Sequence, residues 1–110
     1  MSTEGPVLDT LADMTIASVE HNSLTPREYM MARLAAMVAV DAPPISYFAS
    51  ASTVQESGLS TEDIQGVMIA VAPVTGAPRV MSAGGHILRA LGIAIAVAEA
   101  EIAADEGSQP

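Results

Sequence analysis

Apolar residues recur every three to four positions through most of the chain, which is the spacing of one face of an α-helix. The clearest example follows Gly58, where Ser60 and Thr61 can cap the first amides of a helix and two acidic residues come next. The apolar positions of this helix are Ile64, Val67, Met68 and Val71. Because the proline at position 73 disfavours continuation, the pattern predicts a helix from Thr61 that ends near Ala72.

Start and stop residues divide the rest of the chain into four further helices. We expect them at Pro6 to about His21, Pro26 to about Val40, about Pro44 to Ser57, and about Pro78 to Asp105. The second of these has a strong start signal, because Thr25 can cap it and Glu28 stands three residues beyond the cap. Residues 1–5 and 106–110 are expected to be disordered.

The first and last helices each carry an apolar stripe. In the first helix the positions expected to face inward are Leu8, Leu11, Met14 or Thr15, Ser18 and Val19. In the last helix the stripe consists of Leu88, Leu91, Ile95 and Ala98, widened by Ile93, Val97 and Ile102. Gly84 and Gly85 interrupt the last helix and permit either a close contact with another helix or a kink.

The helix from Pro26 to Val40 has almost no polar face, since Arg33 is its only charged residue after Tyr29. A helix that is apolar nearly all round is surrounded by protein, so we expect it at the centre of the fold or in a subunit interface. Arg33 then has two interpretations. It either reaches the rim or pairs with a carboxylate such as Asp41 or Glu28, or it binds an anion in a pocket.

The composition favours an all-α protein with more apolar surface than one small core can bury. Half of the 110 residues are hydrophobic, and the mean hydropathy is +0.39. These residues are mainly aliphatic, with one Phe, two Tyr and no Trp, which favours helix packing over strands. We therefore expect a single helical domain over residues 1–110 that forms an obligate homo-oligomer.

The apolar runs are too short to predict a membrane span. The longest, from Ala90 to Ala98, is bounded by Arg89 and Glu99, whereas a spanning helix needs about 20 residues. The first residues contain no basic region ahead of an apolar one, so no secretory signal is expected. These features predict a cytoplasmic protein without a membrane partner.

Charge and composition argue against several kinds of chemistry. Thirteen acidic residues oppose four arginines, giving a formal net charge of -9, which argues against nucleic acid as a partner. The absence of cysteine excludes disulfides, thiolate catalysis and thiol metal sites. His21 is expected to cap the end of a helix, and its distance from His86 gives no reason to expect a metal site or a cofactor.

One stretch resembles a known family. The matching residues are Gly58, Thr61, Glu62, Asp63, Ile64, Val67, Gly76, Pro78, Arg79 and Val80. With a weaker match at residues 24–28, this pattern resembles the carboxymuconolactone decarboxylase family, whose fold the alkylhydroperoxidase D-like proteins share. The resemblance covers roughly residues 24–95 and rests mostly on packing and capping positions. It implies an all-α subunit that assembles into trimers or hexamers.

The chain departs from this family at the redox site. Peroxidase-type members use a Cys-x-x-Cys pair and a histidine that precedes the glycine at the end of the helix. Counting back from Gly58 places the histidine at Ser50 and the two cysteines at Pro43 and Ser46. Thiol peroxidase activity is therefore excluded.

The activity that named the family, decarboxylation of an acidic lactone, needs one group to hold a carboxylate and another to move a proton. The candidate anion-binding residues are Arg33 and Arg79, and the candidate catalytic residues are Ser46, Tyr47, Ser50 and His86. Several have plainer interpretations. Arg79 also suits a solvated or ion-paired surface position, and His86 suits a core or interface position with a hydrogen bond to the backbone.

Two functions remain open. The chain is either a cysteine-free lyase or binder of a small carboxylate-bearing molecule, or an inactive oligomeric scaffold or partner-binding protein. The region around Ser46 and Ser50 distinguishes them. Convergent polar groups in a cavity there favour the first function, whereas packed apolar side chains favour the second.

Overall fold

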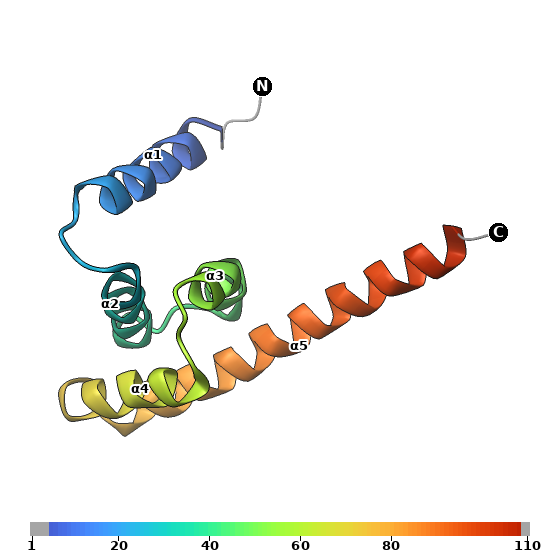
Figure 1. Ribbon diagram of the computed structural model, residues 1–110. Helices are drawn as coiled ribbons and strands as arrows, with labels where there is room; N and C mark the ends of the chain where they lie inside the picture. Colours follow the sequence, from blue (N-terminus) through green and yellow to red (C-terminus); the bar gives the residue numbers. More distant parts are fainter. Residues whose placement is uncertain (1–4, 109–110) are drawn as a thin grey trace.

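The computed structural model describes residues 5–108, which form five α-helices and no β-strand (Figure 1). These are α1 (Gly5–His21), α2 (Pro26–Ala39), α3 (Pro44–Glu56), α4 (Thr61–Thr75) and α5 (Ala77–Ser108). The predicted all-α class is confirmed. Of the termini expected to be disordered, residue 5 belongs to α1 and residues 106–108 to α5, while residues 1–4 and 109–110 lie outside the described part.

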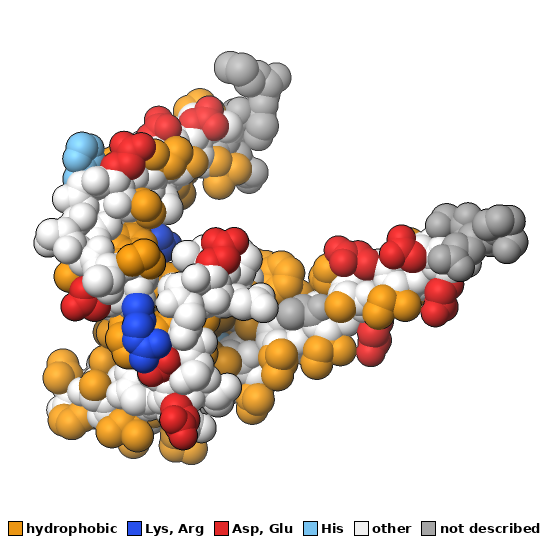
Figure 2. All heavy atoms as spheres, viewed as in Figure 1, with side chains coloured by type: hydrophobic (Ala, Val, Ile, Leu, Met, Phe, Trp, Pro, Cys, Tyr) orange, Lys and Arg blue, Asp and Glu red, His pale blue; other side chains and the backbone are white. Residues whose placement is uncertain are grey.

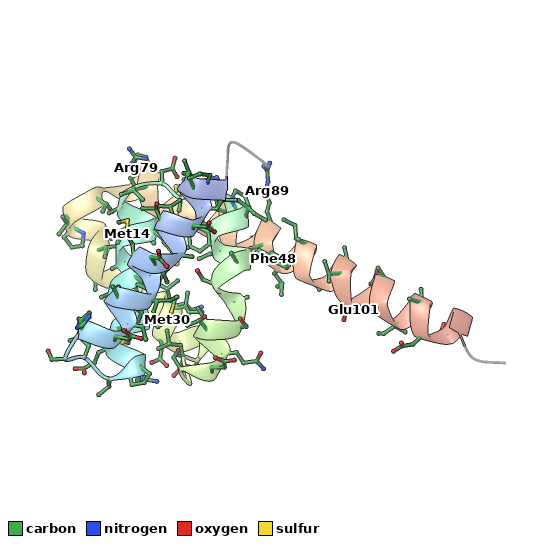
Figure 3. All side chains as sticks on the ribbon, turned by 90° about the horizontal axis from the view of Figure 1, so that it is seen from above. Met14, Met30, Phe48, Arg79, Arg89 and Glu101 are labelled. Atoms are coloured by element: carbon green, nitrogen blue, oxygen red, sulfur yellow. The ribbon has the colours of Figure 1, made fainter. Side chains whose placement is uncertain are left out.

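The core is built around α2, which packs against α3, α4 and α5. At its start the Thr25 hydroxyl accepts the amide of Glu28 (3.1 Å), and the Glu28 carboxylate accepts the amide of Thr25 (2.9 Å), which is the predicted capping box. One face of α2 is buried through Met30, Leu34 and Val38, and Figure 3 shows Met30 within the helical body. The predicted central place of this helix is confirmed.

The start of α4 is tied to the start of α2. The Ser60 hydroxyl accepts the amide of Asp63 (3.1 Å), and the Asp63 carboxylate accepts the amide of Ser60 (2.8 Å). Arg27 of α2 forms an ion pair with Asp63 and donates to the carbonyl of Gly58 (3.2 Å). The backbone hydrogen bond from Ser60, together with the Arg27 guanidinium, lowers the pKa of Asp63.

The predicted end of α4 at Ala72 is wrong, because the helix continues through Pro73 to Thr75. Proline has no amide to donate, so the carbonyl of Ile69, four residues earlier, loses its helical partner. Ile69 is 73% exposed, and water can take that bond. Gly76 ends the helix instead, with a φ of 85° and an amide that donates to the Ala72 carbonyl at 2.8 Å.

The 32-residue helix α5 has two halves with different surroundings. Its first half packs against α2, α3 and α4 and buries Ala83 and Ala90. Gly84 lies beside α4, where an added Cβ would be 3.8 Å from the Met68 methyl carbon, whereas an added Cβ at Gly85 would meet nothing within 4 Å. The helix continues through both glycines, and Gly84 alone serves contact between helices. The second half leaves the body, as the position of Glu101 in Figure 3 shows.

The face of α1 predicted to point inward does lie beside α2, where Leu11 and Ser18 line a groove with Arg33, but none of the described residues of this helix is buried. Its exposed large apolar side chains are Val7, Leu8, Leu11, Met14, Ile16 and Val19. Figure 1 shows α1 standing apart from the other helices, and a 2.9 Å hydrogen bond between Ser18 Oγ and the Tyr29 hydroxyl links it to α2. The amphipathic pattern identifies the face that needs a cover but not the surface that covers it.

The chain is more extended than a compact domain of its length. Its radius of gyration is 16.4 Å, compared with about 13 Å expected for 110 residues. The largest dimension, 55 Å, reflects the two elements that leave the body, α1 and the second half of α5. Among the helices of residues 5–108, none has a segment long and apolar enough to cross a membrane.

Replacing the cap of α4 tests the local basis of this fold. We expect Ser60→Ala to lower the free energy of unfolding by about 1 kcal/mol, since it removes the hydroxyl that accepts the Asp63 amide. Chemical denaturation followed by circular dichroism measures this change. The exposed Ser52→Ala within α3 is the matched control and should stay within about 0.5 kcal/mol of the parent; equal effects of the two variants would contradict a capping role.

Candidate functional site

The main polar cluster of the body is centred on Asp41, directly after α2. Asp41 has a φ of 56°, a backbone conformation that aspartate tolerates better than most residues. Its carboxylate accepts the Ser82 hydroxyl at 2.6 Å and forms an ion pair with Arg79 at 3.3 Å. The Nδ1 atom of His86 lies 3.8 Å from the same carboxylate. Asp41 therefore connects the corner between α2 and α3 to three residues on one side of α5.

The Asp41 cluster has the residue types of a hydrolytic triad but a different arrangement. In a triad the histidine stands between serine and aspartate and takes the serine proton. Here the Ser82 hydroxyl donates directly to Asp41, and among the described residues the buried Nδ1 atom of His86 has no hydrogen-bond partner. The hydroxyl is therefore not activated as a nucleophile in this arrangement. The predicted ion-paired surface position of Arg79 is confirmed, whereas the expected hydrogen bond between His86 and the backbone is not found among the described residues.

Tyr47 lies nearby in the core and is only 6% exposed. Within the described structure its hydroxyl has no hydrogen-bond partner. Burial, and secondarily the negative charge of Asp41, raise the pKa of Tyr47, so the phenol stays neutral above its usual titration range. A buried neutral phenol can donate a hydrogen bond but is a poor base at neutral pH.

The groove beside Tyr47 is apolar and has a volume of about 230 Å³. Its lining residues are Leu34, Tyr47, Phe48, Ala51, Val54, Ile64, Ile87, Ala90 and Leu91. The half-buried Ser46 and Ser50 are not part of this lining, and Pro43 is exposed. The structure therefore brings Tyr47 to the groove but does not bring the two serines or Arg33 with it.

Arg33 lies in a second groove, on the side of α2 that faces α1. It donates to the Tyr29 hydroxyl at 3.1 Å, and its guanidinium carbon is 5.5 Å from the centre of the Tyr29 ring. The suggested pairing with Asp41 or Glu28 is wrong, because Asp41 pairs with Arg79 and Glu28 closes the capping box of α2.

Neither histidine belongs to a metal site in the described part of the chain, where no three His, Asp or Glu side chains gather closely enough to hold an ion. His21 is exposed in the last turn of α1, the place expected for a residue that stabilises a helix end.

Ser82 and Tyr29 belong to these clusters although the sequence did not predict them as site residues. The spacing of Arg79, Ser82 and His86 places them on one side of a helix, which was a usable signal. The approach of Asp41 to that side depends on how the corner between α2 and α3 meets α5. A tertiary contact of this kind leaves no periodic pattern in the sequence.

Comparison with known proteins finds no family model that matches this chain, and no curated protein or solved structure with a significant match. The description of this chain therefore rests on its own sequence and structure. It is an all-α protein of five helices across the described residues, and its sequence has no cysteine.

The two tyrosines should titrate separately. The Ser18 hydrogen bond, and then Arg33, lower the pKa of Tyr29, whereas burial raises that of Tyr47. We expect two phenolate steps in near-ultraviolet absorbance, one below and one above the usual value of about 10. Tyr29→Phe should remove the earlier step and Tyr47→Phe the later one, with circular dichroism recorded in parallel to follow folding. Coincident titration of the two groups in the folded protein would contradict the described surroundings.

Proposed function

We propose that this chain is a subunit of a homo-oligomer that serves as a helical scaffold or partner-binding protein. The observation that carries this proposal is the amount of apolar surface left uncovered by the chain itself. Large hydrophobic side chains are exposed on α1, on α4 and along the second half of α5, as the orange surfaces of Figure 2 illustrate.

The exposed area is large enough for more than one interface. The chain exposes 7702 Å², compared with about 5,700 Å² expected for a compact monomer of 11.2 kDa. The excess of about 2,000 Å² exceeds the roughly 800 Å² that each partner buries in a standard interface. This excess is enough for contact with two neighbours per subunit, which is the arrangement in a closed ring such as a trimer.

A second copy of the same chain fits the charge distribution of α1. Helical geometry places Asp9, Asp13 and Glu20 on the side opposite the stripe that contains Leu8 and Leu11. Apolar faces of two subunits can therefore meet while these carboxylates stay in water. Symmetric association supplies such matching faces without any other partner, which is why we choose a second copy as the occupant.

Membership of the carboxymuconolactone decarboxylase family is part of this proposal, on the residues of the 58–80 segment. Two residues of that resemblance have local support, since Asp63 completes the capping box of α4 and Gly76 ends the helix. The family relationship implies trimers or hexamers, in agreement with the excess surface. A lyase of the family kind has less support here, because Asp41 already neutralises Arg79 and the groove beside Tyr47 is apolar.

Charge placed on the exposed stripe of α5 should separate the subunits. Ile95 is 50% exposed in the isolated chain, so Ile95→Glu should change monomer stability by less than about 0.5 kcal/mol while it places a desolvated charge in an interface. We expect a smaller mass in light scattering and a lower melting temperature for this variant. The parent protein should also melt at lower temperature on dilution, because its stability is linked to association.

Gln55→Glu provides a matched control, since it adds the same charge at an exposed position of α3. It should leave the assembled mass unchanged. A monomeric parent protein at micromolar concentration, with a melting temperature independent of dilution, would refute the proposed assembly.

A further inference from the structure

Arg33 is a cation without a carboxylate partner in a strongly acidic chain. Among the described residues, Arg27 pairs with Asp63 and Arg79 pairs with Asp41, but neither Arg33 nor Arg89 forms an ion pair. Arg89 is exposed to solvent, whereas Arg33 is partly buried beside α1. Thirteen acidic residues were available to neutralise Arg33, so its free charge calls for a physical explanation.

The guanidinium of Arg33 is held in position from one side. Its Nη1 atom donates to the Tyr29 hydroxyl, and the guanidinium carbon lies 5.5 Å from the centre of the Tyr29 ring. The Tyr29 hydroxyl in turn shares a 2.9 Å hydrogen bond with Ser18 Oγ of α1. A guanidinium has five N–H donors, and among the described residues Arg33 uses one of them, toward Tyr29, which leaves the others free for an anion.

The groove at Arg33 combines this polar end with an apolar wall. It is lined by Leu11, Met14, Thr15, Ser18, Tyr29 and Arg33. Its volume of about 270 Å³ is slightly below the usual range of small-molecule sites, about 300 to 1,000 Å³. The groove therefore suits a small molecule with one charged end and one short apolar part.

We infer that Arg33, with the hydroxyls of Tyr29 and Ser18, binds a small carboxylate that carries a short aliphatic chain. The carboxylate pairs with the free edge of the guanidinium, for which two parallel N–H···O bonds are the favoured geometry. The aliphatic part lies against Leu11 and Met14 of α1. Such a ligand contacts both α1 and α2, and it holds the otherwise detached helix α1 against the body.

The groove is formed within one chain, but Leu11 belongs both to its lining and to the α1 stripe that the proposed assembly would cover, so a second copy competes with the ligand for this face. The competing occupant is an acidic side chain from a second copy. The two occupants differ in stoichiometry and in their dependence on protein concentration. A small ligand binds once per subunit at any dilution, whereas a side chain from a second copy leaves when the oligomer dissociates.

Calorimetric titration with octanoate tests the inference. Octanol has the aliphatic chain without the charge, and sulfate has the charge without the chain. We expect one octanoate per subunit and at least about tenfold weaker binding of either other probe. Arg33→Gln should weaken octanoate binding by at least about tenfold, and Arg33→Lys should recover part of the loss, since it keeps the charge without the fork. Arg89→Gln removes the same charge from α5 and should bind as the parent does.

Tyr29→Phe adds a second readout, because it removes the hydroxyl that orients Arg33 and contacts Ser18. It should weaken octanoate binding while leaving the mass of the assembled protein, measured by light scattering, unchanged. Equal binding by Arg33→Gln and Arg89→Gln, or equal binding of octanol and octanoate, would overturn the inference. Saturable octanoate binding that appears only after dissociation of the oligomer would overturn it too, in favour of an acidic side chain of a second copy.

Discussion

The burial of one face of α2 is the interaction on which the rest of the structure depends. Met30, Leu34 and Val38 lie at successive turns of that face and are closed off by α3, α4 and α5. The fully buried side chains are apolar throughout the described chain, so the core has no ionic interaction that fixes its geometry. The polar links stand around it, at Arg27 with Asp63 and at Asp41 with α5. They hold the beginnings of α4 and α5 against α2 and the corner that follows it.

This small core has a consequence at both ends of the chain. Helix α1 and the second half of α5 have apolar stripes but no surface of their own subunit to cover them. The proposed assembly and the proposed ligand both cover apolar surface of these elements, and on α1 they share Leu11. Neighbouring subunits cover the exposed stripes, and a small carboxylate occupies the groove where α1 meets α2. Association with a neighbouring subunit and binding of a ligand each bury apolar side chains, and neither requires a chemical reaction.

The accuracy of the sequence predictions followed the range of the interactions concerned. Thr25 with Glu28 and Ser60 with Asp63 form capping boxes between residues three apart, and such local patterns are visible in sequence. The predicted end of α4 at Ala72 was wrong because the effect of Pro73 depends on whether the Ile69 carbonyl, which loses its helical partner, can bind water. Ile69 is exposed, so it can. Arg33 was recognised as anomalous, but its partner Tyr29 and the groove under α1 depend on the angle at which α1 meets α2.

The sequence by itself determined the helical class, the five helices, most of their ends and the lack of thiol chemistry. Those properties follow from local hydrogen bonding, apolar periodicity and the covalent identity of the side chains. Only the tertiary structure decided that Asp41 binds Ser82 and Arg79, that Ser46 and Ser50 miss the apolar groove, and that α1 lies outside the core. Such contacts join residues far apart in the chain. They depend on how whole helices pack, and many helix faces are similarly hydrophobic, so the sequence pattern does not specify which faces meet.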